Sequence, residues 1–290
     1  MGINISQGLN GIRIDQFDYI NSLIPIDVPR HKQVNKDTPC DENETLAFCR
    51  LVGKLNWVAN QTRPDILFDV CQFSAKMKSP LIRDLIKVNK TLNKVKCSPI
   101  SIYYPGLGDI SKCKLHCFSD ASLNNLESGK SAGGLLICLV NDKGDSCPLF
   151  WKSKTLQRVV RSTLAAETTA MVDVLDVGYY LSYCLSEIIH TSLKSEQTVS
   201  SRAGFCIDSL IPILAFTDNE SLYRNAYSTT MVNEHRLRID IAIVKQMLEK
   251  RELDGINWVS TDKQLADCLT KAGADPAKLM CALETGRVNI

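Results

Sequence analysis

Residues 114–152 contain three apolar segments in succession: Lys114-Leu-His-Cys-Phe-Ser119, Gly133-Gly-Leu-Leu-Ile-Cys-Leu-Val-Asn141 and Pro148-Leu-Phe-Trp-Lys152. Each segment has the length of a β-strand, and turn-forming residues separate them. The connection Asn141-Asp-Lys-Gly-Asp145 is typical of a β-hairpin. This stretch therefore predicts three consecutive strands, and the rest of the C-terminal part adds helices and strands to them.

The segments that follow alternate between helical and extended patterns. The periodicity predicts helices over residues 162–189, 220–226, 234–251 and 264–271, and strands over residues 211–217 and 256–260. The resulting order, β-β-β-α-β-α-α-β-α, predicts an α/β (α+β) fold with helices packed on a mixed five-stranded sheet. Residues 191–209 are long for a connection, and we expect a mobile loop there.

The N-terminal part has a different pattern. Residues 1–15 predict a β-hairpin, because two β-branched segments flank the turn-prone Gln7-Gly-Leu-Asn10. Helices are predicted over residues 16–23, 42–60, 65–76 and 80–96. Pro99 and Gly106-Leu-Gly108 precede the change to strand periodicity. We therefore expect two domains, residues 1–105 and residues 106–290.

The last of these N-terminal helices is strongly amphipathic. Apolar residues recur along one face from Leu81 to Val95. Four basic side chains share the opposite face: Arg83, Lys87, Lys90 and Lys94. The pattern fits two interpretations, a solvated lysine face or a helix whose cations bind a nucleic-acid backbone, and the helix alone leaves both open.

The composition is that of an ordinary globular protein, with 44% apolar and 23% charged residues among 290. The formal net charge of +2 demands no polyanionic partner. Twelve cysteines are scattered without a C-x-x-C pair, which indicates reduced thiols. Neither a signal peptide nor an apolar run of membrane-spanning length is present. The sequence therefore predicts a soluble intracellular protein of the cytoplasm or nucleus, with no membrane partner.

Four acidic residues lie where element ends would bring them together: Asp120, Glu167, Asp218 and Asp267. Their neighbours are small or apolar, which is a poor setting for an isolated charge. An aspartate after a strand is by itself more often a turn or helix cap. Four of them in this order instead predict a cluster that a cation must neutralise. Hard oxygen ligands select Mg²⁺ or Mn²⁺, and two such ions can hydrolyse a phosphodiester.

Three further residues have structural interpretations. Trp57 and Trp258 lie in apolar patterns and are expected in the core. Asp240 is expected to pair with Arg236 one helical turn away rather than to bind a metal.

Several motifs follow one another along nearly the whole chain: Cys49-Arg-Leu-Val-Gly-Lys-Leu-Asn-Trp57, Asn60-Gln-Thr-Arg-Pro-Asp-Ile66, Phe118-Ser-Asp-Ala121, Arg161-Ser-Thr-Leu-Ala-Ala-Glu167, Thr217-Asp-Asn219 and Gln264-Leu-Ala-Asp-Cys-Leu-Thr-Lys271. In this order they resemble the C-terminal part of a copia-type retrotransposon polyprotein, namely the end of its reverse transcriptase followed by its ribonuclease H domain. The Arg-Pro-Asp-Ile motif and the motif at residues 264–271 are the most specific.

The resemblance implies a ribonuclease H-like fold for residues 106–290, with Asp120, Glu167, Asp218 and Asp267 as the family's four metal-binding acids. It implies that residues 1–15 follow the polymerase active site and that residues 42–96 are the thumb and connection. It also implies that His235 and Arg236 lie near nucleic acid, although a solvated turn explains them equally well. The paired aspartates of the polymerase would lie upstream of Met1, and no Tyr-x-Asp-Asp occurs, so no polymerase activity is expected.

The leading hypothesis is thus a two-metal ribonuclease that cleaves the RNA strand of an RNA–DNA hybrid, attached to a partial reverse transcriptase. Two alternatives stay open on the sequence. The chain could be a decayed nucleic-acid-binding fragment without turnover, or a reverse-transcriptase fragment that needs a missing N-terminal part. The sequence indicates no oligomeric state.

Overall fold

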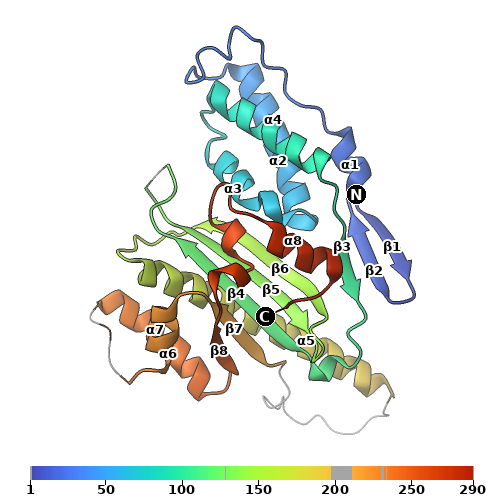
Figure 1. The fold of residues 1–290 in the computed structure, drawn as a ribbon, viewed down its shortest axis with the longest axis vertical. Coiled ribbons are helices and arrows are strands. Elements are labelled where there is room, and N and C mark those ends of the chain that lie inside the picture. The colour runs from blue at the N-terminus through green and yellow to red at the C-terminus, as the bar shows by residue number, and fades with distance from the viewer. Residues whose placement is uncertain (1, 128, 197–210, 230–231, 233, 290) are drawn as a thin grey trace.

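The computed structural model describes residues 2–127, 129–196, 211–229, 232 and 234–289. Its centre is a five-stranded sheet with the order β6-β5-β4-β7-β8 (Figure 1). The strands are β4 (Lys114–Ser122), β5 (Ala132–Val140), β6 (Ser146–Thr155), β7 (Ile213–Thr217) and β8 (Gly255–Trp258). β4, β5 and β6 pair antiparallel, whereas β4, β7 and β8 pair parallel. The predicted mixed five-stranded sheet is confirmed.

The sheet is covered on both faces, which explains why β5 is apolar along its whole length. Leu135, Ile137 and Leu139 of β5 belong to one hydrophobic core. This core also contains residues of α5 (Thr163–Glu196), α6 (Glu220–Tyr227) and α7 (His235–Glu249). The alternate residues of β5 face the other core, as the two-residue period of a strand requires.

The second core joins the sheet to the N-terminal helices. It contains buried residues of α2 (Glu42–Gln61), α3 (Leu67–Ala75), α4 (Ile82–Cys97) and α8 (Ala277–Thr285), together with Leu136 and Phe216 of the sheet. Figure 1 shows α8 lying across this face of the sheet, with α2, α3 and α4 beyond it. This core thus contains residues from both sides of the expected boundary at residue 105.

The N-terminal hairpin is present as β1 (Asn4–Gly8) and β2 (Gly11–Asp15), followed by α1 (Phe17–Ser22). β3 (Ile102–Pro105) pairs antiparallel with β2 and completes a three-stranded sheet. The sequence did not predict β3, because a strand of four residues that ends in a proline carries little periodicity. Because β3 pairs with β2, the N-terminal hairpin is held next to the segment that leads into β4.

Capping explains where the N-terminal helices begin. The Asp41 side chain accepts a hydrogen bond from the backbone N–H of Glu44, and the Glu44 side chain accepts one from the Asp41 N–H. This capping box starts α2 one residue after Asp41, as predicted. α4 buries Leu85, Val88 and Leu92 completely, so the predicted apolar face is confirmed.

The predicted helix over residues 264–271 is wrong. A single 3₁₀ turn, η5 (Asp267–Leu269), occupies this segment, and the last helix is α8, which was not predicted. The Gln264 side chain donates to the Ser119 carbonyl of β4 and accepts from the Ala266 N–H. The bond to Ser119 is tertiary and the bond to Ala266 is local, and with them the Gln264 backbone is extended. These contacts outweigh the helix propensity of the segment.

Two further expectations are corrected. Trp57 and Trp258 are not core residues, since 38% and 50% of their surfaces are exposed. Asp240 pairs with Arg158, which precedes α5, through two hydrogen bonds of 2.9 and 2.8 Å, and not with Arg236. The partner of Asp240 therefore comes from a distant part of the chain.

The cysteines of the described residues are free thiols, as predicted. The expected mobile loop at residues 191–209 lies largely outside the described residues, and the described part of it, up to Glu196, continues α5. Within the part of the chain that the structure describes, no helix is long and apolar enough to cross a membrane.

Candidate metal centre

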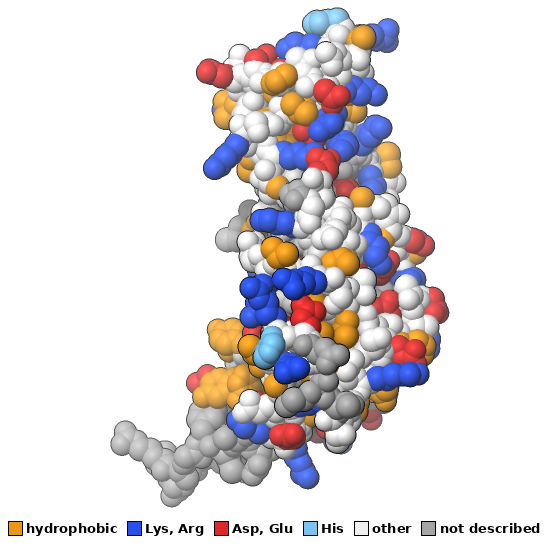
Figure 2. Space-filling model, turned by 90° about the vertical axis from the view of Figure 1, so that its left-hand side faces the viewer, with side chains coloured by type: hydrophobic (Ala, Val, Ile, Leu, Met, Phe, Trp, Pro, Cys, Tyr) orange, Lys and Arg blue, Asp and Glu red, His pale blue; other side chains and the backbone are white. Residues whose placement is uncertain are grey.

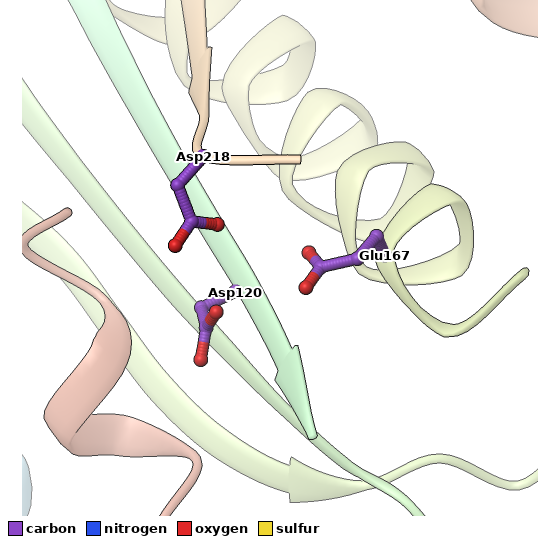
Figure 3. Close-up of side chains that lie close together, drawn as sticks. All are labelled: Asp120, Glu167 and Asp218. Atoms are coloured by element: carbon purple, nitrogen blue, oxygen red, sulfur yellow. The ribbon is translucent and has the colours of Figure 1, made fainter. Parts of the chain in front are cut away.

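Three of the predicted acids meet in one place. One carboxylate oxygen from each of Asp120, Glu167 and Asp218 lies within 4.8 Å of the others. Figure 3 shows their carboxylates pointing toward one another, Asp120 from β4, Asp218 from the end of β7 and Glu167 from α5. The sequence prediction of a carboxylate cluster is confirmed for these three residues, which we call the acidic triad.

The register of the sheet places two members of the triad side by side. β4 and β7 run parallel with Phe118 opposite Phe216, and the two rings stack at a centroid distance of 4.8 Å. Asp120 and Asp218 each follow two residues later. Because side chains alternate along a strand, they project from the same face at the same end of the sheet.

α5 brings the third carboxylate close because small residues face the sheet. A Cβ on Gly178 of α5 would lie only 2.8 Å from the Cys117 sulfur of β4. Only glycine permits approaches this close. The Ser162 hydroxyl caps α5 by accepting from the Ala165 N–H, which fixes the start of the helix just before Glu167.

Burial gives the triad unusual protonation properties. Desolvation is the main cause that raises the pKa of Glu167 to about 9, and the negative charges of Asp120 and Asp218 add to it. Desolvation likewise raises the pKa of Asp120 to about 6, opposed by the Thr270 hydroxyl and by Lys271. Without a counter-charge, this cluster favours bound protons over three carboxylate charges.

The triad suits a hard divalent cation. Glu167 is 6% exposed, and its Oε2 atom is buried without a hydrogen-bond partner among the described residues. An unpartnered carboxylate oxygen in a buried site is costly unless a ligand completes its coordination. All three donors are carboxylate oxygens, which is the set that Mg²⁺ and Mn²⁺ prefer. The residues present therefore fit the predicted cation.

The pKa of Glu167 leads to a testable pH dependence. Its folded-state value of about 9 lies above the ordinary 4.5, so between these values the folded protein holds a proton that the unfolded chain has released. Stability is therefore lost as the pH rises through this window. In EDTA, we expect the melting temperature of the wild type to fall from about pH 7 to pH 9 more steeply than that of Glu167→Gln. Equal slopes in the two proteins would contradict the buried environment of Glu167.

Asp267 does not belong to the triad, but it lies next to it. The Lys271 ammonium is 2.5 Å from Asp267 Oδ1 and 3.9 Å from Asp120 Oδ2. The Thr270 hydroxyl donates to the same Asp120 Oδ2. The segment that carries these residues approaches the sheet closely at Gly134, where a Cβ would lie 2.8 Å from Leu269. Thr270 and Lys271 were not predicted as site residues, although both lie in the motif at residues 264–271.

Asp218 is the most accessible member of the triad. Its Oδ2 accepts a hydrogen bond of 2.9 Å from the Thr261 hydroxyl, and its backbone carbonyl accepts one of 3.0 Å from the Trp258 indole. Trp258 is half exposed beside the triad. The apolar pattern of residues 256–260 did not predict that Trp258 is exposed. Its exposure depends on β8 being an edge strand, which the sequence does not indicate.

The predicted basic side chains of α4 are partly paired with acids. Arg83 binds Asp37 at 2.8 Å, Lys87 lies 3.7 Å from Glu127, and Lys94 lies 3.6 Å from Asp65. For Lys90, the described residues contain no ion-pair partner. Figure 2 shows one face of the molecule, where Lys and Arg side chains recur from the N-terminal helices downward with acidic side chains between them.

A groove runs from this helix to Lys271, beside the metal centre, and no member of the acidic triad lines it. It has a volume of about 560 Å³ and is lined from α4 by Lys87 and Lys90 and from the other side by Ser122 and Lys271. Ser122 ends β4, two residues after Asp120, and the Lys271 ammonium lies beside Asp120. His235 and Arg236 are exposed at the start of α7 and do not line this groove.

The sheet and the triad together define the class of this protein: an α/β protein with a buried cluster of three carboxylates where two parallel strands end. No known family model matches the sequence. A curated relative, the retrovirus-related Pol polyprotein from transposon RE1 of Arabidopsis thaliana, is 24% identical over 284 residues, which are 93% of this chain. The chain spans only 18% of the length of that relative.

Solved structures similar to the chain include ribonuclease H1 from the archaeon Halobacterium salinarum. The match covers 54% of this chain and 94% of that protein, with 18% identity and a TM-score of 0.36. The foamy viral protease-reverse transcriptase in complex with an RNA/DNA hybrid is matched over 93% of this chain and 31% of that chain, with 13% identity and a TM-score of 0.36.

Proposed function

We propose that this chain is a metal-dependent ribonuclease that hydrolyses the RNA strand of an RNA–DNA hybrid. We further propose that it derives from a copia-type retrotransposon polyprotein, with residues 1–105 as a remnant of the reverse transcriptase and residues 106–290 as a ribonuclease H domain. The observation that carries the proposal is the buried acidic triad with its unpartnered Glu167 oxygen. The name of the Arabidopsis relative, a Pol polyprotein, supports the origin.

In this proposal the triad holds the cations, and Asp267 contributes from beside it. Bound Mg²⁺ or Mn²⁺, as two ions, would supply an activated water and stabilise the leaving oxygen of the phosphodiester. The protein's own residues keep the carboxylates in place. Thr270 and Lys271 orient Asp120, and Thr261 orients Asp218. Burial of Glu167 excludes bulk water from one side of the cluster.

The groove between α4 and the metal centre is where we expect the duplex backbone to bind. Lys87 and Lys90 face it from the helix, so a phosphate chain along the groove would reach Asp120 past Lys271. Phosphate contacts of this kind position the duplex and carry little sequence preference. Recognition of the hybrid would also depend on its shape and on the 2′-hydroxyl groups of the RNA strand. Arg83 and Lys94 do not line the groove and would contribute less, whereas Lys87 would have to turn from Glu127 toward a phosphate. His235 and Arg236 would contact nucleic acid elsewhere.

The direct test uses a labelled RNA–DNA hybrid, a duplex RNA and a duplex DNA of the same sequence, each incubated with the protein in Mg²⁺ or Mn²⁺. We expect cleavage of the RNA strand of the hybrid alone, leaving a 3′-hydroxyl on the upstream product. Binding of the hybrid without cleavage in either metal would favour a decayed nucleic-acid-binding fragment. Cleavage of duplex DNA at an equal rate would contradict the substrate.

The groove leads to a prediction about binding. Lys87→Gln with Lys90→Gln should weaken hybrid binding uniformly across sequences and reduce the slope of log affinity against log salt by about one for each phosphate that is no longer bound. Lys94 is left unchanged because it pairs with the buried Asp65. The matched control replaces two exposed lysines outside the groove, Lys143 and Lys250, with glutamine. Equal salt slopes in all three proteins would show that the face of α4 is merely solvated.

A further inference from the structure

We propose that Lys271 is a built-in cation that competes with a second divalent ion, so that the free protein binds one ion tightly at the triad and a second only weakly. The proposal rests on the proposed function, because it concerns the ions of that same site. Its basis is an asymmetry in how the carboxylates around Asp120 are neutralised.

On one side of Asp120, the negative charge already has partners. The Lys271 ammonium is 2.5 Å from Asp267 Oδ1 and 3.9 Å from Asp120 Oδ2. The Thr270 hydroxyl donates to Asp120 Oδ2 as well. Asp120 and Asp267, which could share a divalent ion, are therefore bridged by Lys271. The lysine supplies one positive charge, whereas the two carboxylates carry two negative charges.

On the other side of Asp120, Glu167 and Asp218 have no cationic partner among the described residues. Glu167 Oε2 is buried without a hydrogen bond, and Asp218 accepts one from the neutral Thr261 hydroxyl. The ion pairs of the described residues at this site involve Asp120 and Asp267, not Glu167 or Asp218. Within the triad, Glu167 and Asp218 therefore depend on an added cation, whereas Asp120 and Asp267 share the Lys271 ammonium. The first ion is expected at the triad, where the uncompensated charge is greatest.

Lys271 can also leave its position. Its side chain is 44% exposed and lines the groove together with Lys87 and Lys90. An ammonium on a flexible stem turns toward a phosphate in that groove at little cost. A second ion and the Lys271 ammonium are thus alternatives for the same carboxylates, and binding of either weakens binding of the other.

Mn²⁺ titration, followed by calorimetry and by electron paramagnetic resonance of the free ion, tests this without substrate. We expect one tight ion in the wild type. Lys271→Gln should bind a second ion at least about tenfold more tightly than the wild type does, and Lys271→Gln with Asp267→Asn should lose that gain. Lys263→Gln, an exposed lysine on the same connection, is the matched control and should behave as the wild type.

Asp267→Asn alone gives a second measurement that does not depend on the folding of the Lys271 variant. It should leave the one tight ion unchanged, because Asp267 is occupied by Lys271 in the free protein. Two tight ions in the wild type, one of them lost in Asp267→Asn, would overturn the proposal, as would Lys271→Gln with an unchanged second ion. A wild type that binds no Mn²⁺ at all, with Glu167→Gln identical to it, would instead overturn the proposed metal centre.

Discussion

Asp120→Asn should abolish cleavage of an RNA–DNA hybrid while leaving the protein folded. The substitution keeps the size of the side chain and removes one charge from the acidic triad, where Asp120 is 2% exposed. Changes in residues that only orient a metal ligand cost about 10–100-fold in activity or metal affinity, so loss of a ligand should cost at least about 100-fold. The measurement is the initial rate of cleavage in saturating Mg²⁺ and Mn²⁺.

The melting temperature of Asp120→Asn distinguishes loss of catalysis from loss of the folded structure. Removing one of three crowded carboxylates should leave the metal-free melting temperature unchanged or raise it, because the charges repel one another. The control is Asp142→Asn, which changes an exposed aspartate in the turn between β5 and β6. It should cleave at the wild-type rate. An Asp120→Asn protein that still cleaves at a rate close to the wild type would contradict the role of the triad.

Arg63→Met should produce the largest loss of stability among single substitutions in the N-terminal part. Arg63 is 1% exposed and binds Asp65 through two hydrogen bonds of 2.8 and 3.0 Å. Its third nitrogen donates to the carbonyls of Val95 and Ser98 at the end of α4. Without Arg63, the buried Asp65 carboxylate keeps only the half-exposed Lys94 ammonium, 3.6 Å away, as an ionic partner. We expect the free energy of unfolding to fall by about 3–5 kcal/mol.

Arg63→Met should also disturb the packing of the turn beside the metal centre. Asp65 lies in η1 (Pro64–Ile66), which contacts η5, the turn that begins at Asp267. Chemical denaturation of Arg63→Met and of Arg50→Met, which changes an exposed arginine of α2, measures the difference. Arg63→Met with Asp65→Asn should recover part of the loss, since no unpaired buried charge then remains. A loss below about 1 kcal/mol, as is usual for surface ion pairs, would contradict this account.

Arg63 illustrates what the sequence could and could not indicate. The Arg-Pro-Asp-Ile motif was recognised through its resemblance to retrotransposon polyproteins, but nothing in its spacing predicts that the guanidinium lies buried against the end of α4. A lone arginine before a proline is normally a surface residue. Its partners Val95 and Ser98 are distant along the chain, and only the packing of the N-terminal helices brings them together.

The sheet was predictable because its signal is local. β5 is apolar throughout, the Asn141–Asp145 connection specifies a hairpin, and α7 carries a clear helical stripe. Segments whose conformation depends on tertiary contacts were missed. β3 exists because β2 pairs with it, and the turn at η5 exists because Gln264 binds β4.

The metal centre likewise contains residues that the sequence predicted and residues that it did not. The strand ends of β4 and β7 predicted that Asp120 and Asp218 would meet, and the adjacent alanines singled out Glu167. The lysine that bridges Asp120 and Asp267 could not be predicted, because Lys271 reaches Asp120 only through the close approach at Gly134. The exposure of Trp258 could not be predicted either, because it depends on β8 lying at the edge of the sheet.

Restoration of cleavage by metal tests the central claim most directly. The wild-type protein, stripped with EDTA and dialysed, is mixed with a hybrid labelled on its RNA strand, and Mg²⁺ or Mn²⁺ is then added. The acidic triad predicts no cleavage before the addition and RNA-strand cleavage after it, with a rate that saturates as the ion binds. A folded protein that binds the hybrid and never cuts it at any concentration of either metal would contradict the assignment.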